Sequence, residues 1–436
     1  MKKKLVSALL VAAMATSLVA CGGKEDKNSQ AGKNEGKDTQ SEVSKDDALK
    51  ALIEATKDPV DLTVWCSEQE NWQTEMKKIT EDFKALYPDV TFNFKIGAES
   101  EANAKDDLLK DPEAGGDVFV FADDQITELA KAKILQEVTT TYTYDMADNY
   151  EEDAMNAASV DGKQYAYPLT TNGYFLFYNK DFVSDEQAGS WEGLLEAAKA
   201  CNGVIGMDMG NAWYVYGWFA GAGLTCTFAD DGVNNVCDWN STTNTPTGAA
   251  VGKYIMDLSA NPEFQSIGDG DSRTLKITVD GKEKNIIGYV DGLWAANDYT
   301  KAIGDKLGAA KLPTFNIDGT DYQMGGFKGY KMVGVNAYSK NPGWSMIFAE
   351  YLTSAKTQAE IYETLGEGPA NKNTASVANS PAIAGSMAQL PYSDFQRVGG
   401  NFWTPGASLG TTLYEGTKDI QKALDDAVTG ITAPAQ

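Results

Sequence analysis

The sequence predicts an α/β protein with two domains, each containing a mostly parallel sheet flanked by helices. Short apolar runs typical of buried strands alternate with helical patterns between residues 62 and 138. This alternation favours a parallel sheet with right-handed crossovers. The part of the chain that can fold is roughly 380 residues long, whereas domains seldom exceed about 250 residues. We therefore expect two domains rather than one.

The elements of the first domain follow in order from the hydrophobic pattern. LTVWC (62–66) reads as a buried strand, and VTFNFKI (90–96) alternates like a half-buried one. Between them, apolar residues recur at helical spacing until Pro88 ends the helix, and they are Trp72, Met76, Ile79, Phe83 and Leu86. The next expected elements are a helix at 102–109, a buried strand at 117–122 and a helix at 126–138.

The middle of the chain is rich in aromatic residues. Residues 162–182 carry seven aromatic side chains around the polar run Thr170-Thr171-Asn172. The pattern alone leaves open a core strand, the wall of an active site, or a surface that holds a ligand. Beyond it we expect helices at 191–200 and 212–223, strands at 203–209 and 285–296, and a helix-rich end.

Composition excludes several kinds of function. A net charge of −25 would be repelled by nucleic acid and by anionic membrane surfaces. The chain has no histidine, so Ser-His-Asp and Cys-His catalysis are excluded and the commonest zinc ligand is missing. Catalysis by paired carboxylates remains open. The 9 Trp, 20 Tyr and 16 Phe suit core packing, and they also suit sugars, whose C–H faces stack on aromatic rings.

The amino terminus predicts export. Three lysines at positions 2–4 precede an apolar run that is too short to span a bilayer, so residues 1–20 read as a signal peptide. Leu18-Val19-Ala20-Cys21 resembles the bacterial lipobox. It implies a lipid on Cys21, which would anchor the protein to the extracellular face of the cell membrane.

A linker follows the lipidation site. Residues 21–45 are rich in Gly, Ser, Asn, Lys and acidic residues, and such a segment stays flexible because it cannot bury a core. We expect the folded part to begin near Asp46 or at Pro59.

Four further cysteines leave the disulfide state open. They are Cys66, Cys201, Cys226 and Cys237. Outside the cell they could pair in three ways, and buried free thiols are equally consistent with the pattern. Their spacing does not suggest a zinc site, and the acidic stretches 230–235 and 269–272 lack the twelve-residue calcium-loop pattern. We expect neither a metal nor a cofactor.

Six stretches resemble, in the same order, the family 1 extracellular solute-binding proteins of ABC importers. They are LTVWCSEQENWQTEMKKITEDFKALYPDVTFNF, GGDVFVFADDQITELAKAKILQEVT, DGKQYAYPLTTNGYFLFYNKDF, GYVDGLWAANDY, KLPTF and GGFKGYKMVGVNAYSKNP. The ordered set is specific and covers the chain from Leu62 onward. Within the family, the chain is most similar to the maltose/maltodextrin-binding lipoproteins of Gram-positive bacteria.

The resemblance implies a two-domain periplasmic-binding-protein-like fold of type II, in which two lobes joined by a hinge close on a sugar. The chain would cross between the lobes at Pro168–Asn172, at Ala309–Pro313 and near Lys331–Gly334. No chemistry is required, so no enzymatic activity is expected. The implied partners of a monomeric protein are a neutral oligosaccharide, above all a malto-oligosaccharide, and the permease subunits of the importer.

The same resemblance implies the boundaries of the lobes. The N-terminal lobe would comprise residues 59–170 and 313–330. The C-terminal lobe would comprise residues 173–309 and 334–436.

Candidate ligand-binding residues are carried over from the resemblance. The sugar-stacking positions of the family fall on Phe121, Trp213 and Trp294, and its carboxylate position falls on Asp124. Asn172 stands where the maltodextrin binders have a carboxylate, and an amide can both donate to and accept from sugar hydroxyls.

Two regions depart from the pattern of the family. Glu68 and Gln69 follow the first strand, where maltodextrin binders have an acid and a lysine. The late stacking tryptophan of those proteins aligns with Thr411, while Trp403 lies a few residues upstream among turn formers.

Other functions stay open on the sequence alone. A surface glycoside hydrolase would use paired acids such as Glu68 and Asp124, one of them with a raised pKa. Both acids lie in polar, acidic contexts with no evident apolar pocket. A non-transporting surface lectin would need no hinge, and a binding protein for a different oligosaccharide would keep the fold and change the ligand.

Overall fold

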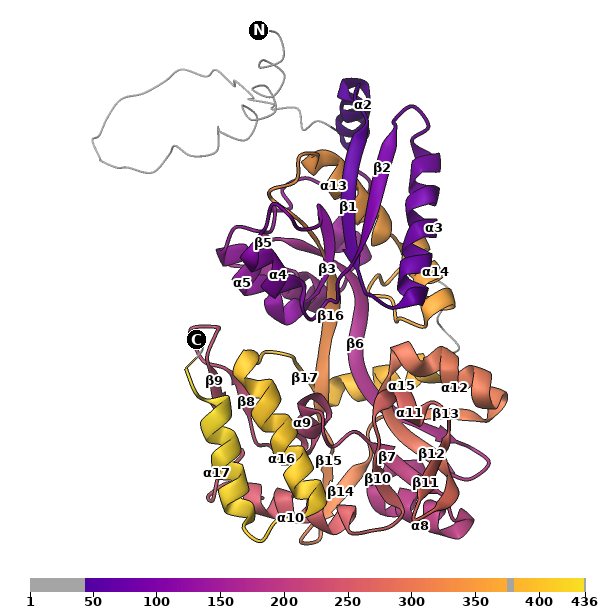
Figure 1. The fold of residues 1–436 in the computed structure, drawn as a ribbon, viewed down its shortest axis with the longest axis vertical. Coiled ribbons are helices and arrows are strands. Elements are labelled where there is room, and N and C mark those ends of the chain that lie inside the picture. Colours follow the sequence, from indigo (N-terminus) through magenta and orange to yellow (C-terminus); the bar gives the residue numbers. More distant parts are fainter. Residues whose placement is uncertain (1–43, 375–379, 435–436) are drawn as a thin grey trace, which may run out of the picture. The chain divides into compact units, whose positions relative to one another are not determined.

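The computed structural model describes residues 44–374 and 380–434. The predicted signal peptide, Cys21 and the linker up to residue 43 lie outside the described residues. One mixed sheet has the strand order β10-β7-β12-β6-β16-β3-β1-β2 (Figure 1). Buried hydrophobic residues cluster around its two halves. We call the half with β1, β2 and β3 the N-terminal lobe, and the half with β7, β10 and β12 the C-terminal lobe.

The N-terminal lobe is built on three parallel strands. β1 (Val60–Cys66) lies between β2 (Phe92–Ala98) and β3 (Val118–Ala122) and pairs in parallel with both. α3 (Glu70–Leu86) connects β1 to β2, and it buries every member of the expected apolar stripe except its last residue, which is exposed. The strands expected from the hydrophobic pattern are therefore confirmed.

One helix of this lobe is shorter than expected. α4 (Ala104–Lys110) matches its prediction, but α5 (Ile126–Lys131) covers only the first part of residues 126–138. Lys133 adopts a φ of 60°, which a right-handed helix cannot continue. The chain then turns so that Leu135 pairs with Asn336.

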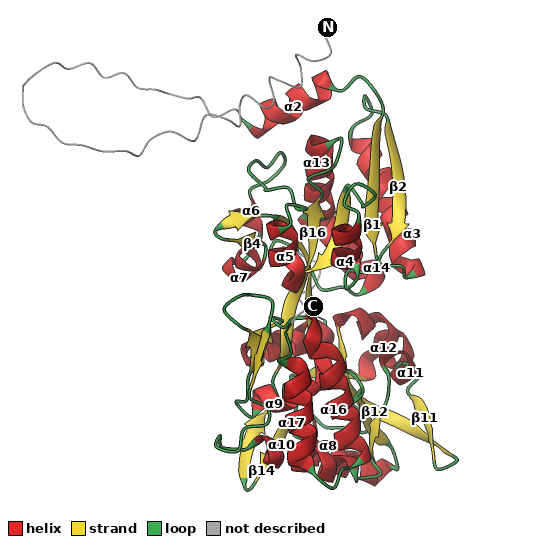
Figure 2. Ribbon diagram, turned by 60° about the vertical axis from the view of Figure 1, so that its left-hand side comes forward, coloured by secondary structure: helices red, strands yellow, loops and turns green. Residues whose placement is uncertain are grey.

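The C-terminal lobe repeats the arrangement of strands and helices. β7 (Val204–Met207) pairs in parallel with β10 (Phe264–Ser266) and with β12 (Lys282–Gly292). Its principal helices are α8 (Trp191–Cys201), α9 (Ala212–Gly221), α10 (Gly248–Ser259), α12 (Ala296–Ile303), α16 (Trp403–Glu415) and α17 (Ile420–Ile431). Figure 2 shows α16 and α17 side by side, and α16 also contacts α9.

Two long strands run through both lobes. β6 (Ala166–Asn179) and β16 (Gly326–Val335) pair antiparallel, and β16 also pairs with β3 in the N-terminal lobe. The second half of β6 pairs with β12 and with β13 (Leu307–Ala310) in the C-terminal lobe. The aromatic stretch is thus a core strand, and its polar middle, residues 171–173, is only half-buried.

The packing corrects part of the expected lobe division. β13 pairs with β6 inside the C-terminal lobe, so Ala309–Pro313 is not a crossing. Phe315 and Met324 belong to the C-terminal core, whereas Trp344 and Phe348 pack with β1 and α3 in the N-terminal core. The expected assignment of residues 313–330 to the N-terminal lobe was wrong. Of residues 334–436, expected in the C-terminal lobe, the part up to Ala370 packs in the N-terminal core, whereas the part from Val398 onward packs in the C-terminal core as expected. The KLPTF motif does not show on which side of the molecule its apolar residues pack.

Further helices and strands complete the two lobes. They are α2 (Lys45–Ala55), α6 (Met146–Asn149), α7 (Glu152–Ala157), β4 (Ser159–Val160), β5 (Lys163–Gln164), β8 (Cys226–Phe228), β9 (Asn235–Cys237), α11 (Asp269–Ser272), β11 (Lys276–Val279), β14 (Thr314–Ile317), β15 (Thr320–Gln323), α13 (Pro342–Leu352), α14 (Ala355–Leu365), α15 (Pro381–Gln389) and β17 (Ser393–Phe395). No helix within the described ranges is long and apolar enough to cross a membrane.

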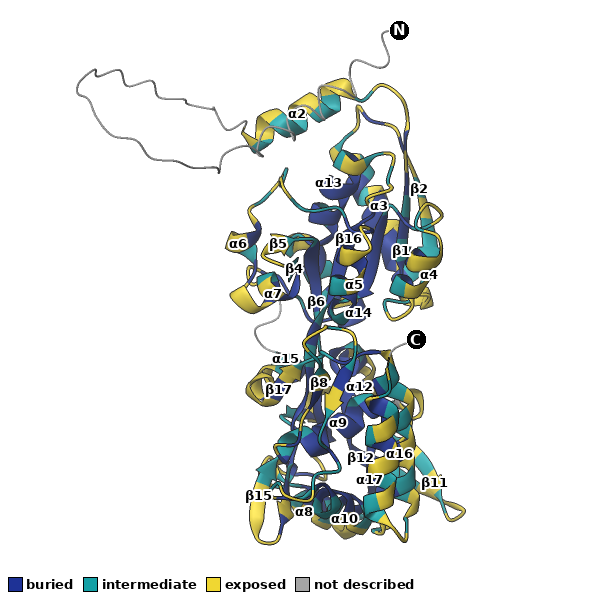
Figure 3. Ribbon diagram, turned by 90° about the vertical axis from the view of Figure 1, so that its left-hand side faces the viewer, coloured by how far each residue is buried: buried dark blue, intermediate teal, exposed yellow. Residues whose placement is uncertain are grey.

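Most of the aromatic side chains serve the cores. Figure 3 shows buried residues concentrated along the strands, while α16 and α17 carry exposed outer faces. Trp191, Trp218 and Trp239 are fully buried in the C-terminal core. The high aromatic content is therefore largely structural, and only half-buried aromatics remain available to a ligand.

A buried charge cluster lies where β16 enters the N-terminal lobe. Lys331 Nζ is 2.9 Å from Glu367 Oε1 and 3.1 Å from Glu101 Oε1. Trp72 Nε1 donates a further hydrogen bond to Glu367 Oε1 at 3.3 Å. Burial alone would raise the pKa of Glu101, but the attraction of Lys331 and hydrogen bonds together lower that pKa below its usual value. The single cation thus stabilises one buried carboxylate, that of Glu367, and one half-buried carboxylate, that of Glu101.

We expect Lys331→Met to destabilise the fold by about 3–5 kcal/mol, because it leaves the carboxylates of Glu367 and Glu101 without a counter-charge. A carboxyl group whose pKa is lowered in the folded protein, such as that of Glu101, stabilises the fold at pH above its unfolded-state pKa of about 4.3. This stabilisation is lost as the pH falls through the folded-state pKa. The destabilisation caused by Lys331→Met should therefore be full at pH 7 and should shrink below about pH 4. Urea unfolding of both proteins at several pH values measures it. Lys163→Met, which removes an exposed pair with Glu137, is the control and should change little. An equal effect of the two substitutions would contradict the role of burial.

Candidate ligand-binding site

Two consecutive acids follow β3 at the edge of the N-terminal lobe. Asp123 and Asp124 lie in a short 3-10 turn, η1 (Asp123–Gln125). Asp124 Oδ2 accepts a hydrogen bond of 2.8 Å from Gln396 Nε2, and Arg397 Nη1 lies 3.2 Å from Asp123 Oδ2. Gly329 on β16 leaves room for Asp123, since a Cβ there would come within 2.7 Å of Asp123 Oδ1. Two neighbouring acids are thus held by two neighbouring residues from the other end of the chain.

Two tryptophans face one another in the C-terminal lobe. Trp213 lies in the first turn of α9, where the side chain of Asn211 accepts a hydrogen bond from its backbone nitrogen at 3.0 Å. Trp294 lies in η3 (Leu293–Ala295), directly after β12. Their ring centroids are 5.5 Å apart, and both side chains are half-buried. A Cβ on Gly292 would come within 2.0 Å of the Trp294 ring, so only glycine allows this ring position.

Gln396 connects the tryptophan pair to the acids. Its Oε1 accepts a hydrogen bond of 2.9 Å from Trp213 Nε1, while its Nε2 donates to Asp124. The indole nitrogen can only donate and an ionised carboxylate can only accept, so the orientation of the amide is determined by its partners. We call Asp124, Gln396 and Trp213 the interlobe relay. It joins an acid of the N-terminal lobe to an aromatic ring of the C-terminal lobe.

Burial shapes the electrostatics of the acid pair. Burial raises the pKa of Asp123 to about 7, against the opposing attraction of Arg397 and with a smaller contribution from the charge on Asp124. Burial also raises the pKa of Asp124 above its usual value. The groups around Asp124 are nevertheless polar and charged, among them Gln396 and Arg397. Asp124 Oδ1 is buried and has no hydrogen-bond partner among the residues that the structure describes.

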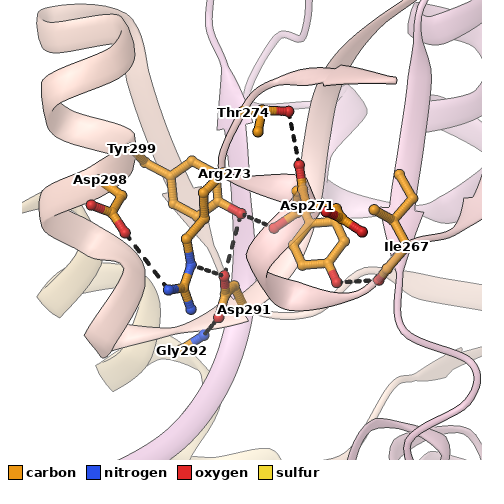
Figure 4. Close-up of polar contacts among 10 residues, drawn as sticks. Ile267, Asp271, Arg273, Thr274, Asp291, Gly292, Asp298 and Tyr299 are labelled. Atoms are coloured by element: carbon orange, nitrogen blue, oxygen red, sulfur yellow. Dashed lines mark hydrogen bonds and ion pairs between the residues drawn. The ribbon is translucent and has the colours of Figure 1, made fainter. Parts of the chain in front are cut away.

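A network of charges supports the turn that carries Trp294 (Figure 4). Asp291 is fully buried, and its Oδ1 accepts a hydrogen bond of 2.8 Å from the backbone nitrogen of Gly292. Its Oδ2 accepts from Arg273 Nε at 3.4 Å and from the Tyr299 hydroxyl at 3.3 Å. Arg273 also pairs with Asp298 at 3.6 Å. These contacts fix the end of β12 and hence the position from which Trp294 projects.

Trp403 lies beside an open depression on the C-terminal lobe. It opens α16 and is half-buried. The depression has a volume of about 750 Å³ and is lined by Asp208, Gly210, Asn211, Ala212, Trp403, Thr404, Ala407, Ser408, Thr411 and Thr412. Two of the lining residues, Asn211 and Ala212, directly precede Trp213 in the chain. The lining of the depression offers hydroxyls, an amide and one aromatic ring, with a single acid.

Other candidate residues lie apart from the relay. Phe121 is fully buried against Phe119 in the N-terminal core, so the prediction that it stacks on a ligand is contradicted. The last residues of an apolar strand can face either side, and the sequence did not distinguish them. Glu68 and Gln69 are exposed at the carboxyl end of β1, on the same sheet edge as the end of β3. Asn172 is half-buried on β6, paired with Gly329.

Sequence reasoning missed Gln396, Arg397, Asp291 and Arg273. Each acts through a partner far away in the chain, and no local period or motif marks any of them. One available signal was the DFQR sequence (394–397) at the end of β17, where an amide and a cation stand together in an acidic protein. Within the described residues, no group of three Cys, Asp or Glu side chains could hold a metal ion.

The raised pKa of Asp123 makes folding stability depend on pH. The folded protein binds this proton more tightly than the unfolded chain, so the stabilisation is complete below about pH 4 and is lost as pH rises through about 7. We expect Asp123→Asn to gain stability relative to the wild type between pH 5 and 8, measured by urea unfolding. Arg397→Met should move the decline to higher pH, because the cation that favours ionisation is gone. A stability difference independent of pH would contradict this assignment.

Comparison with known proteins identifies the family of this chain. The family model described as "Bacterial extracellular solute-binding protein" matches residues 78–385. A galactooligosaccharide-binding protein of Bacillus subtilis is 26% identical and covers 98% of this chain and 96% of its own length. A maltooligosaccharide ABC transporter solute-binding lipoprotein of Streptococcus pneumoniae is 24% identical, over 82% of this chain and 88% of its own.

Solved structures share the fold. One with acarbose superposes with a TM-score of 0.73 at 28% identity, covering 86% of this chain and 99% of that one. The maltodextrin-binding protein MalE1 of L. casei without ligand gives a TM-score of 0.71 at 24% identity, covering 87% and 100%. The two-lobed fold of type II is therefore shown. The family model matches more than half of the residues of this chain, so this chain belongs to the bacterial extracellular solute-binding proteins.

Proposed function

We propose that the protein is the substrate-binding subunit of a carbohydrate ABC importer and that it captures a neutral oligosaccharide, above all a malto-oligosaccharide, between its lobes. The observation that carries this proposal is the relay: a half-buried tryptophan pair on one lobe is linked through Gln396 to an acid on the other. A ligand that contacts both groups would hold the two lobes together.

The chemistry of the site suits a neutral sugar. Tryptophan rings stack on the C–H faces of a pyranose, each worth about 0.5–1.5 kcal/mol beyond area burial. The free oxygen of Asp124 and the hydroxyls beside Trp403 would exchange hydrogen bonds with sugar hydroxyls, each worth about 1 kcal/mol net. Arg397 is already paired with Asp123, so it is engaged by the protein itself rather than free to hold an anionic ligand. We expect micromolar affinity, equivalent to about −8 kcal/mol.

The relatives support an extracellular, membrane-anchored location for the protein. The family is extracellular, and the pneumococcal relative is named as an ABC transporter lipoprotein. We propose that Cys21 carries the lipid after removal of residues 1–20. A monomer anchored in this way would present its sugar to a pair of permease subunits in the same membrane.

The relatives found are solute-binding proteins rather than enzymes. We therefore propose that the bound oligosaccharide is not hydrolysed. Release of reducing ends on long incubation would instead support the glycoside hydrolase alternative, in which a raised pKa such as that of Asp124 would belong to a general acid.

Titration calorimetry of the protein against a panel of sugars tests the function. The panel should contain maltose to maltoheptaose, galacto-, cello- and xylo-oligosaccharides, and a mixed peptide pool. Micromolar binding that strengthens from maltose to longer malto-oligosaccharides is expected. Binding heat from galacto-oligosaccharides alone would still support an importer subunit, but with a different sugar as its ligand. Galacto-oligosaccharides are the second candidate ligand because the galactooligosaccharide-binding relative covers 98% of this chain. The absence of binding heat with every sugar in the panel would contradict the proposal.

Trp294→Ala should weaken sugar binding at least tenfold with little change in melting temperature, because its half-buried ring would contact the ligand. Trp344→Phe is the matched control. It removes a 2.9 Å hydrogen bond from Trp344 Nε1 to the Thr56 hydroxyl in the N-terminal core. This control should lower the melting temperature and leave affinity unchanged. Loss of stability without loss of affinity in Trp294→Ala would make that tryptophan part of the core.

Gln396→Met should weaken sugar binding about 3–10-fold, because methionine fills the same space but releases both Trp213 and Asp124. Trp213→Phe removes the same indole donor and keeps an aromatic ring. In a double-mutant cycle measured by calorimetry, the loss caused by Gln396→Met should be smaller in the Trp213→Phe background. Fully additive losses would show that the two residues act independently and that the relay does not orient the site.

A further inference from the structure

Two cysteines face each other across a hairpin of the C-terminal lobe. β8 and β9 pair antiparallel, with Cys226 directly opposite Cys237. Backbone hydrogen bonds join Asp238 N to Thr225 O at 3.0 Å and Ala229 N to Asn234 O at 2.7 Å. Hydrogen-bonded pairs alternate with non-hydrogen-bonded pairs along an antiparallel ladder, so the cysteines occupy a non-hydrogen-bonded position. Cα atoms in such pairs lie about 4.5 Å apart, within the range of about 4.4–6.8 Å that a disulfide spans.

The two side chains also point to the same surface. Cys226 is 2% exposed and belongs to the C-terminal core, and the half-buried Cys237 packs against that core. The two thiols lie within hydrogen-bonding reach of each other. The strand register, the backbone spacing and the direction of the two side chains are therefore all compatible with a covalent bond between the two sulfurs.

We propose that Cys226 and Cys237 form a disulfide bond in the exported protein. The family is extracellular, and disulfides form and persist outside the cell. The sequence left three pairings of the four cysteines open, and the structure favours one. Cys66 is buried in β1 of the N-terminal lobe, and Cys201 ends α8 with its thiol directed to Ala198 O at 3.6 Å. Both of these remain thiols.

The oxidant is a disulfide, either that of an extracellular thiol oxidoreductase or a small-molecule disulfide. The thiolate of Cys237, the more accessible sulfur, attacks one oxidant sulfur and displaces the other as a thiolate. The thiolate of Cys226 then attacks Cys237 Sγ and displaces the second oxidant sulfur. The two protons of the cysteines end on the two released thiols, and the oxidant is reduced by two electrons.

The bridge would strengthen a hairpin that holds the backbone after Gln396. Phe228 N donates to Arg397 O at 2.6 Å, and Gly399 N donates to Asn235 Oδ1 at 2.7 Å. Asn235 Nδ2 donates at 3.0 Å to the backbone carbonyl of Ile431, in the last turn of α17. A covalent link at the open end of the hairpin restrains all of these contacts. It thereby also restrains the segment after β17 that carries Gln396, the central residue of the interlobe relay.

Peptide mapping of the full chain, exported by its host and unfolded without reductant before alkylation, tests the bridge. Alkylation after unfolding is needed because the hydrogen bond with Cys237 and burial raise the pKa of Cys226, which makes the native thiol unreactive. We expect a linked peptide pair containing Cys226 and Cys237, lighter by two hydrogens than the reduced peptides. Cys66 and Cys201 should be alkylated directly.

Two variants serve as controls. Cys66→Ser/Cys201→Ser should keep the bridge. In the wild type, dithiothreitol should lower the melting temperature by about 2–6 °C, and it should have no such effect on Cys226→Ser/Cys237→Ser. Alkylation of both Cys226 and Cys237 as free thiols, after export and after incubation with oxidised glutathione, would overturn the proposal. So would a bridge from either of them to Cys66 or Cys201. Neither outcome bears on sugar binding, which calorimetry tests separately.

Discussion

The antiparallel pairing of β6 with β16 is the constraint on which the rest of the structure depends. Each strand belongs to the sheets of both lobes, so one ladder of backbone hydrogen bonds fixes how the chain passes between them. The half-buried residues 171–173 lie on this ladder. Lys331 on β16 pairs with Glu367 and Glu101 from other parts of the N-terminal lobe, which keeps the ladder anchored there. Loss of the pairing would separate the groups that form the site.

The arrangement of the site offsets the cost of burying two neighbouring acids. An acidic protein places Asp123 and Asp124 side by side where burial disfavours their ionisation. Arg397 and Gln396 offset this, one with a charge and the other with a hydrogen bond, and the amide of Gln396 then reaches the indole of Trp213. Polar and aromatic contacts are thereby oriented before any ligand arrives, which reduces the entropy lost on binding.

Local patterns predicted the elements well and the long-range contacts poorly. Continuous apolar runs identified β1 and β3, and the resemblance to a known family led to Trp213 and Trp294, which the structure brings together. The stacking role of Phe121 was also carried over from that resemblance, and the structure instead buries its ring in the N-terminal core. Gln396 and Arg273 act on residues in other elements through single polar contacts, and no period in the sequence records such a contact. The packing of residues 313–330 depended on the tertiary core rather than on their own pattern.

Hydrogen–deuterium exchange with and without a bound malto-oligosaccharide tests most directly whether one ligand contacts both lobes. We predict slower exchange in both lobes at once. In the N-terminal lobe the affected segment is residues 122–126 after β3; in the C-terminal lobe the affected segments are residues 292–296 after β12 and the first turn of α9. Slower exchange in only one lobe, with the other unchanged at saturating sugar, would contradict a site shared between them.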